Sequence, residues 1–240
     1  MPLIRPFAGL RPVAGRAEDV VAPPYDVLNS TEARARAAGR PWSFLHISKA
    51  EIDLPEGTDP HADEVYARAA SNLQAMLQEG VLARDPGPCY YVYRLVMGEH
   101  RQTGLVAAAS VAAYDSNRIR KHEFTRPDKE DDRVRQIEAL QAQTGPVLLA
   151  YESQPDVDAL LEAATASDPD VDLVADDGIG HTLWLVSEPS AIEKISSAFD
   201  AMPALYIADG HHRSAAASRV AASHGGSDAA SWFLTVIFPH

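Results

Sequence analysis

The sequence contains very little cysteine. Cys89 is its one thiol among 240 residues, which excludes an internal disulfide framework and a zinc site built from several cysteines. A single cysteine fits the reducing environment of the cytosol. No segment is apolar over the length of a membrane helix, and residues 1–6 lack the apolar core of a signal peptide. We therefore expect a soluble, cytoplasmic protein that does not engage a membrane.

Positive charge is also scarce. The chain has 21 lysines and arginines against 34 aspartates and glutamates, a net charge of −13. A non-specific nucleic-acid binder needs a basic surface, and no recognition helix with a basic face is visible, so we expect no nucleic-acid partner and no role in DNA partition. Apolar residues make up 46% and charged residues 23%, an ordinary globular mixture. The sequence leaves the oligomeric state open.

The apolar patterns predict strands and helices in mixed order. Strands are expected near residues 20–22, 42–47, 88–97, 102–113, 145–151, 182–186, 205–208 and 231–238. Helices are expected near residues 31–39, 61–79, 127–144, 157–166, 191–199 and 211–222. This order indicates an α+β (mixed α/β) fold. Residues 1–115 and 116–240 are candidate subdomains within one region.

Residues 205–217 concentrate the chemistry of the chain. A short apolar run ends at Asp209 and Gly210, and an Ala-rich helix follows. Gly210 allows a positive φ at the turn, and the start of a helix offers free N–H groups and a positive dipole end. His211, His212 and Arg213 stand at the same corner, which therefore predicts an anion site. The alternative is that Asp209 only caps the helix and that both histidines are solvated.

A second stretch, residues 118–133, is basic within an acidic protein. It contains Arg118, Arg120, Lys121, Arg126, Lys129 and Arg133. Lys129 and Arg133 are four apart on the expected helix and share a face. This pattern predicts an anion-binding surface, and its alternative is a solvated, salt-bridged helix start.

A proline-rich turn is the third candidate. The short strand near residues 20–22 leads into Pro23 and Pro24, which present Tyr25 and Asp26. A loop stiffened in this way is either a connector or the wall of a pocket.

Three motifs carry a resemblance to a known family. Residues 22–26 (APPYD), 121–133 (with K-H-E-x-T, K-E and D-R) and 206–213 (YIADGHHR) resemble the bacterial and archaeal family catalogued as domain of unknown function 1015. The resemblance covers essentially the whole chain. Members of that family usually run well beyond this length, so it implies that the 240 residues are an N-terminal portion of a longer protein.

The motif at residues 209–213 also resembles the nucleotide-binding motif of the ParB/sulfiredoxin superfamily, which includes ADP-dependent free-serine kinases. This resemblance implies a ParB/sulfiredoxin-like core with additional mixed sheet and helices. It further implies that nucleotide phosphates or Mg²⁺ bind at Asp209, Gly210, His211, His212 and Arg213. Those kinases use a glutamate to activate the substrate hydroxyl. Glu123 is our candidate for that role, by chemistry alone.

The favoured function is phosphoryl transfer from ADP or ATP to a small, serine-like hydroxylated metabolite, which needs positioning and charge neutralisation. In this hypothesis Asp209 holds Mg²⁺, and Glu123, Asp209, His211 and His212 form the catalytic set. The phosphate-binding set is Gly210, Arg213, Lys121, His122, Thr125, Arg126, Lys129 and Arg133.

Two alternatives stay open beside this function. One is a sensor that binds a nucleotide or phosphometabolite without turnover. The other is a divalent-metal hydrolase that uses His211 and His212, although adjacent histidines on one turn rarely reach the same metal.

Overall fold

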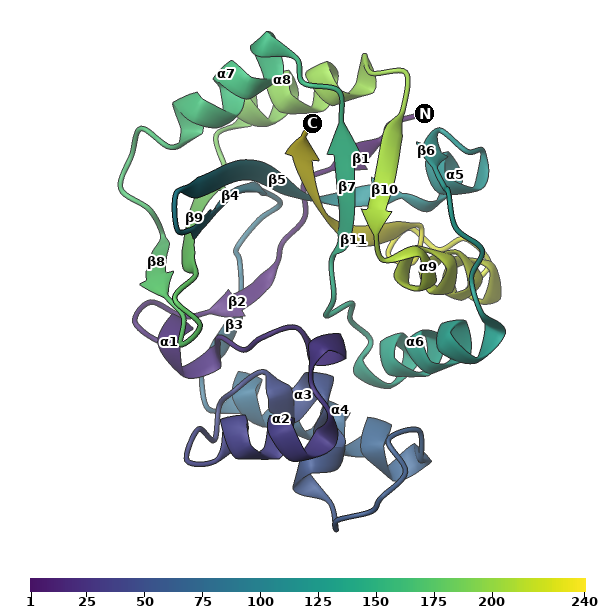
Figure 1. The fold of residues 1–240 in the computed structure, drawn as a ribbon. Coiled ribbons are helices and arrows are strands. Elements are labelled where there is room, and N and C mark those ends of the chain that lie inside the picture. The colour runs from purple at the N-terminus through teal and green to yellow at the C-terminus, as the bar shows by residue number, and fades with distance from the viewer. The chain divides into compact units, whose positions relative to one another are not determined.

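The computed structural model describes all 240 residues, which form two compact units (Figure 1). Unit 1 comprises Met1–Gly9, Pro86–Val134 and Gln143–His240. Unit 2 comprises Leu10–Asp85 and Arg135–Ala142. The units are therefore interleaved along the chain, and the subdomain boundary considered between residues 115 and 116 falls inside unit 1.

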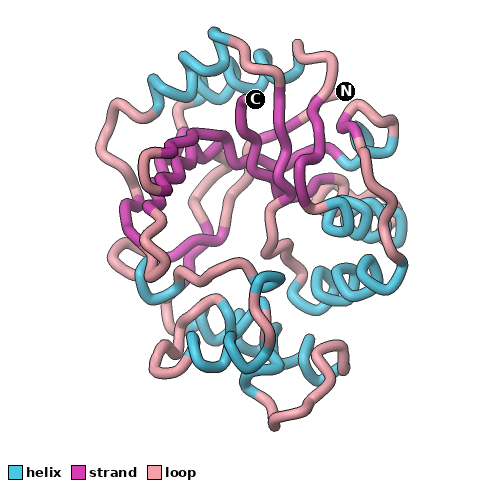
Figure 2. The backbone as a smooth tube through the Cα atoms, viewed as in Figure 1, coloured by secondary structure: helices cyan, strands magenta, loops and turns pink.

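Helices and strands follow one another in mixed order along the chain, and Figure 2 distinguishes them by colour. The strands are β1 (Ile4–Arg5), β2 (Leu10–Pro12), β3 (Leu82–Arg84), β4 (Tyr90–Met97), β5 (His100–Ser110), β6 (Ile119–Arg120), β7 (Val147–Tyr151), β8 (Val171–Val174), β9 (Gly180–Val186), β10 (Leu205–Asp209) and β11 (Trp232–Pro239). The α-helices are α1 (Ala17–Val20), α2 (Ser30–Ala37), α3 (Leu45–Ser48), α4 (Asp63–Gln78), α5 (Val111–Asp115), α6 (Pro127–Leu140), α7 (Pro155–Ala164), α8 (Pro189–Asp200) and α9 (His211–Ser223). Two 3₁₀ helices are η1 (Tyr25–Val27) and η2 (Ala50–Asp53). The α+β class expected from the sequence is confirmed.

Unit 1 is built on a nine-stranded sheet. Its strands follow the order β6-β10-β7-β11-β5-β4-β9-β8, and β1 pairs with β5. The pairs β10–β6 and β11–β7 are parallel, and the other pairs are antiparallel. The sheet is therefore mixed, with β6 and β10 at one end of the strand order.

The core of unit 1 follows the period-2 alternation of its strands. In β10, Leu205 and Ile207 are buried while Tyr206 between them is exposed. The buried side chains join one cluster with residues of the covering helices. Helices α7 and α8 pack against each other, α7 contacts β5 and β9, and α8 contacts β1. Helix α9 packs on α5, β7 and β11.

One glycine of the sheet is required by a close approach. A Cβ on Gly104 of β5 would lie 2.4 Å from the carbonyl oxygen of Ile237 in β11. Such a contact forces the backbone to shift, so β5 and β11 pair closely at this point only because residue 104 has no side chain.

Unit 2 is mostly helical around α4. Its core gathers the apolar face of α4 (Val65, Ala69, Leu73 and Met76) with Leu140 at the end of α6. Gln136 of α6 is buried and donates a hydrogen bond to the carbonyl of Ile47 (3.1 Å). Helix α6 thus contributes its first residues to unit 1 and its last residues to unit 2.

Two predicted strands are wrong. Residues 42–47 form a turn leading into α3, where His46 N–H and Ile47 N–H bond to carbonyls three residues earlier. The segment near residues 20–22 contains the end of α1 and then irregular backbone. In both places a short apolar run is buried by local turns, a case that periodicity alone does not separate from a strand.

No helix is both long and apolar enough to cross a membrane.

Candidate functional site

The two informative stretches meet because β6 and β10 pair in parallel. Ile119 stands opposite Leu205, and Arg120 opposite Tyr206. Parallel strands leave the sheet at the same edge, so the loop after β6 and the corner after β10 emerge side by side. The Arg118 guanidinium donates hydrogen bonds to the carbonyls of Asp200 (2.7 Å) and Met202 (2.8 Å). Arg118 directly precedes β6, and the two carbonyls lie shortly before β10, so these bonds hold the starts of both strands together.

The corner itself depends on Gly210. Its φ of 94° lies in the left-handed region, and it is the N-cap of α9. A Cβ at this position would come within 2.9 Å of Arg213 Nε and 3.2 Å of Val147 Cα. No side chain caps α9, so its first N–H groups and the positive end of its dipole face the corner without a side-chain acceptor.

Small residues keep α9 close to the sheet. Ser214 and the three alanines that follow it are buried. The Ser214 hydroxyl donates to the carbonyl of His211 (3.1 Å) within the first turn. The start of the helix, which carries His211, His212 and Arg213, is therefore packed closely on the elements beneath it.

Asp209 and Arg213 form an ion pair across the corner. The Asp209 side chain is 65% exposed and that of Arg213 only 18%. Arg213 Nε is buried and has no hydrogen-bond partner. Asp209 therefore satisfies only part of the guanidinium. Leaving the buried Nε donor without a partner costs free energy of folding.

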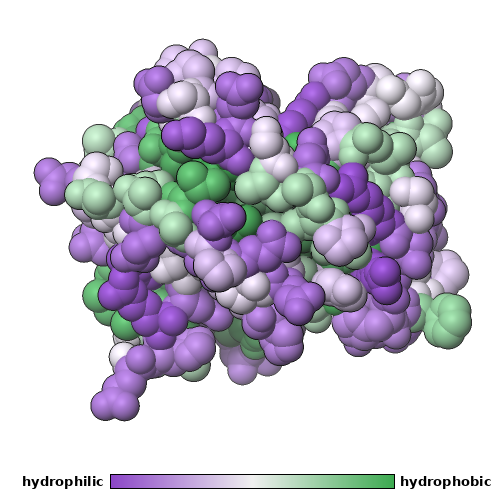
Figure 3. Space-filling view, turned by 90° about the horizontal axis from the view of Figure 1, so that it is seen from above, coloured by the Kyte–Doolittle hydropathy of each residue, from purple (hydrophilic) through white to green (hydrophobic).

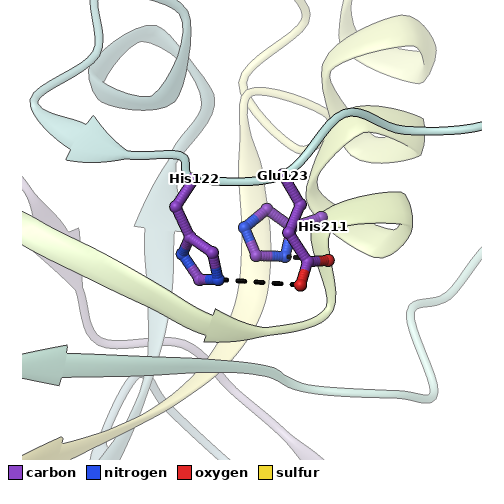
Figure 4. A group of neighbouring side chains, drawn as sticks. All are labelled: His122, Glu123 and His211. Carbon is purple, nitrogen blue, oxygen red and sulfur yellow. Dashed lines mark ion pairs between the residues drawn. The ribbon is translucent and has the colours of Figure 1, made fainter.

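His211 points into the interior, toward the loop after β6. Only 4% of the surface of His211 is exposed to solvent. Its Nδ1 lies 3.5 Å from one carboxylate oxygen of Glu123, and His122 Nε2 lies 3.7 Å from the other. The two imidazole rings meet edge to face with centroids 4.5 Å apart. In Figure 4 both rings turn toward the Glu123 carboxylate, with His122 and Glu123 on the loop and His211 on α9.

The surroundings of His211 favour its neutral form. Burial lowers the pKa of His211 below its usual value, and the neighbouring His122 lowers it further. The negative charges of Glu123 and Asp209 act in the opposite direction but do not outweigh the burial. His211 Nε2 is buried and has no hydrogen-bond partner.

His212 points elsewhere. Its Nε2 accepts a hydrogen bond from the backbone N–H of Arg126 (3.2 Å). Adjacent helix residues project about 100° apart, which accounts for the divergence. The cluster with metal-binding spacing consists of His122, Glu123 and His211. It does not include His212, so the two adjacent histidines do not share one site.

A polar network ties the start of α6 to α9. The Thr125 hydroxyl donates to Glu130. Arg219 of α9 contacts both Glu130 (3.2 Å) and Asp131 (2.6 Å). Arg219 carries no signal of this role in the sequence, because nothing in its local sequence separates it from any other arginine on a helix.

Most of the predicted cations have partners of their own. Lys121 Nζ lies 3.8 Å from the ring centroid of Tyr114. Arg126 pairs with Asp128 (2.7 Å), and Arg133 pairs with Asp132. Lys129 is exposed in the first turn of α6. The salt-bridged alternative thus describes much of this stretch. The Glu123 carboxylate and the backbone N–H of Arg126 are the groups of this stretch that contact the corner, at His211 and His212.

The proline turn belongs to unit 2. Pro23 and Pro24 precede η1, which begins at Tyr25 and Asp26. Their role as a pocket wall stays a prediction.

A depression of about 600 Å³ lies elsewhere, between α7 and α8, and is lined by Asp156, Ala159, Leu160, Glu193, Lys194 and Ser197. Figure 3, seen from above, shows hydrophobic side chains in the middle of a face with many hydrophilic ones around them. None of the predicted site residues lines this depression, and we assign it no role.

The fold and the corner define a mixed α+β protein with a polar site where a strand meets a helix. The model of the family described as Protein of unknown function (DUF1015) matches residues 4–240. The chain belongs to this family, which confirms the resemblance seen in the three motifs. No curated protein and no solved structure matches the chain. The ParB/sulfiredoxin-like core stays a prediction.

Proposed function

We propose that the Asp209–Arg213 corner binds the phosphate groups of a nucleotide or a phosphorylated metabolite. The favoured activity is phosphoryl transfer from ADP or ATP, with Mg²⁺, to a small serine-like hydroxylated metabolite. The partner is thus a small molecule, and the single cysteine favours the cytoplasm as the compartment. The ParB/sulfiredoxin resemblance of the motif supports the nature of the reaction, and the geometry of the corner supports the phosphate site.

One observation carries the proposal: the start of α9 has no side-chain cap and follows a left-handed glycine. Free N–H groups and the helix dipole together attract anions, and phosphate oxygens are well suited to this position. Gly210 lets the backbone approach a ligand closely. The strand–glycine–helix order is thus a local geometry that favours phosphate binding.

Arg213 supplies the matching positive charge. Its guanidinium is engaged by Asp209, yet its Nε has no partner. A phosphate group offers several acceptor oxygens to a guanidinium at once. We expect a bound phosphate to compete with Asp209 for Arg213, after a small movement of the side chain.

Asp209 is the matching residue for Mg²⁺. Its carboxylate is largely exposed, and Mg²⁺ in nucleotide sites uses one or two carboxylates together with phosphate oxygens. Bound Mg²⁺ would neutralise charge on the phosphates. A Mg²⁺–nucleotide therefore brings an anion for Arg213 and a cation for Asp209, so that neither side chain loses a partner when their ion pair opens.

Glu123 is the proposed proton acceptor. It is exposed and lies beside His211, whose neutral form is favoured. Phosphoryl transfer to a hydroxyl needs a group within hydrogen-bond reach of that hydroxyl. In the proposed reaction the Glu123 carboxylate takes the hydroxyl proton, and His211 and His122 orient it.

Binding without turnover is the second candidate, and one contact is compatible with it. The hydrogen bond from Arg126 N–H to His212 links the corner to a loop whose Phe124 is fully exposed. A ligand at the corner would move that loop through His212. Such a link serves a sensor as well as an enzyme.

The test is calorimetric titration of ADP, ATP and AMP, with Mg²⁺, into the wild type and the Arg213→Ala variant. The control is Arg101→Ala, which removes a surface arginine that pairs at 3.9 Å with Glu162. Binding lost in Arg213→Ala and kept in Arg101→Ala supports the site. No binding to the folded wild type refutes the nucleotide assignment for this chain. Consumption of ADP or ATP with serine present then separates the kinase from the sensor.

A further inference from the structure

We propose that His122, Glu123 and His211 bind a divalent transition metal ion of the zinc class. This site is separate from the phosphate site at Asp209 and Arg213, and the inference does not depend on the proposed function. It uses residues from two stretches that are adjacent only in the folded chain.

The geometry of the three side chains is close to that of a metal site. One ligand atom from each residue lies within 4.8 Å of the others. The two contacts to Glu123, from His211 Nδ1 and His122 Nε2, are 3.5 Å and 3.7 Å. Tetrahedral zinc with bonds of about 2.0–2.2 Å holds its ligand atoms about 3.3 Å apart. Small side-chain movements would therefore bring all three onto one ion.

The ligand set selects the class of metal. Two imidazoles and one carboxylate suit zinc and its neighbours, whereas Mg²⁺ prefers oxygen ligands. Three protein ligands leave a fourth position for water or another small ligand. Glu123 also supplies the one negative charge that offsets part of the charge of the ion.

The burial of His211 is an independent observation. It is 4% exposed, and its Nε2 has no hydrogen-bond partner. The nitrogen that faces the cluster is Nδ1, at 3.5 Å from the Glu123 carboxylate, so the buried imidazole presents this nitrogen, and not the unpaired Nε2, to a metal ion. This ring is held against a carboxylate and a second imidazole, at the inner end of the cluster (Figure 4).

The nearby cations do not occupy the cluster. Lys121 lies over the ring of Tyr114, and Arg126 pairs with Asp128. Arg213 pairs with Asp209. The Glu123 carboxylate, in contrast, forms its ion pairs with the two histidines and not with a lysine or an arginine. The position most suited to a cation is therefore not filled by a lysine or an arginine.

The metal site has a consequence for Glu123. A carboxylate that coordinates a metal cannot at the same time accept a substrate proton. Zinc is therefore expected to inhibit any phosphoryl transfer that depends on the free Glu123 carboxylate, and a chelator is expected to restore it.

The test is calorimetric titration of Zn²⁺ alone into the full chain, freed of affinity tag and stripped with a chelator. His122→Ala and Glu123→Gln remove ligands that are largely exposed, so both variants should fold, as circular dichroism would verify. His100→Ala is the control, because His100 is exposed at the start of β5. Cobalt(II) absorption in the visible range provides a second readout of the coordination.

We expect one Zn²⁺ per wild-type chain and unchanged binding in His100→Ala. Loss of a supporting partner already weakens metal sites about 10- to 100-fold, so each ligand variant should weaken binding by at least about tenfold. Absence of saturable binding, or equal binding in wild type and both ligand variants, overturns the inference. ADP titration of the same proteins is read separately, so failure of nucleotide binding leaves the metal result intact.

Discussion

His212 Nε2 accepts a hydrogen bond from the backbone N–H of Arg126, 86 residues earlier in the chain, at 3.2 Å. This bond joins the first turn of α9 to the loop between β6 and α6. The same loop carries His122 and Glu123. The position of those two side chains opposite His211 therefore depends in part on His212. His212 itself takes no part in the ion pairs and ring contacts of the cluster.

His212→Ala should loosen this loop while costing only about 1 kcal/mol of stability, the usual net value of one hydrogen bond. Hydrogen exchange of the amides of residues 121–126 should become faster. His212→Gln, whose amide oxygen can accept at a similar reach, should restore slow exchange. If both variants exchange like the wild type, the bond does not hold the loop.

Gly210→Ala should disturb the corner more than an ordinary glycine substitution. Alanine at a φ of 94° is strained, and its Cβ would lie 2.9 Å from Arg213 Nε and 3.2 Å from Val147 Cα. Strain at such a position costs about 1–3 kcal/mol. Urea denaturation of Gly210→Ala and Gly225→Ala gives the comparison, because Gly225 also has a positive φ (64°) but open space around it. Equal losses would show that the contacts with Arg213 and Val147 add nothing to the backbone strain.

Much of the fold could be predicted from patterns along the chain. The aromatic and β-branched run near residues 88–97 contains β4, and the apolar spacing over residues 61–79 contains α4. The Asp-Gly turn between an apolar run and an Ala-rich segment marked the end of β10 and the start of α9. In each case a strong local signal agrees with the tertiary structure.

Other parts depend on contacts between distant residues. Strand β8 is a four-residue strand paired only with β9, and it carries too short a pattern to be recognised. Strand β6 has two residues, yet its pairing with β10 places Glu123 beside His211. No local pattern encodes that pairing, so the sequence supplied candidate residues but not the His122–Glu123–His211 cluster.

His46 and Asp53 of unit 2 should make stability depend on pH. They form an ion pair at 2.7 Å. The hydrogen bond to Asp53 raises the pKa of His46, and burial opposes the shift. For Asp53, burial favours the neutral form, but hydrogen bonds from His46 and Asn72 outweigh it and lower the pKa. At mildly acidic pH both groups are therefore charged in the folded state.

A raised histidine pKa stabilises the fold below the unfolded value of about 6.5, and this contribution is lost as the pH rises through the folded pKa. His46→Ala should therefore lose more stability, relative to the wild type, at about pH 5.5 than at about pH 8. The pH-dependent part should be at most about 1 kcal/mol, because water screens a partly exposed pair. Urea denaturation at the two pH values measures it, with His100→Ala as control. A loss independent of pH would mean that His46 acts only through packing and neutral hydrogen bonds.

Asp209→Asn should change nucleotide binding in opposite directions with and without Mg²⁺. Asparagine keeps the size of the side chain but removes the charge that pairs with Arg213 and repels a phosphate. Without Mg²⁺, affinity for ADP should therefore increase, by about fivefold if roughly 1 kcal/mol of repulsion and competition is removed. With Mg²⁺ the wild type should gain affinity and the variant should not, because a neutral amide is a poorer ligand for Mg²⁺ than a carboxylate.

Calorimetric titration of ADP into both proteins, once with excess chelator and once with Mg²⁺, provides the four affinities that decide this. The pattern expected for an exchange of partners is a crossing: the variant binds more tightly without Mg²⁺ and the wild type more tightly with it. A variant weaker under both conditions would mean that Asp209 acts only by holding Arg213 in place. Equal Mg²⁺ dependence in the two proteins would move the metal away from Asp209, since a ligand cannot lose its charge without changing the affinity of the ion that it holds.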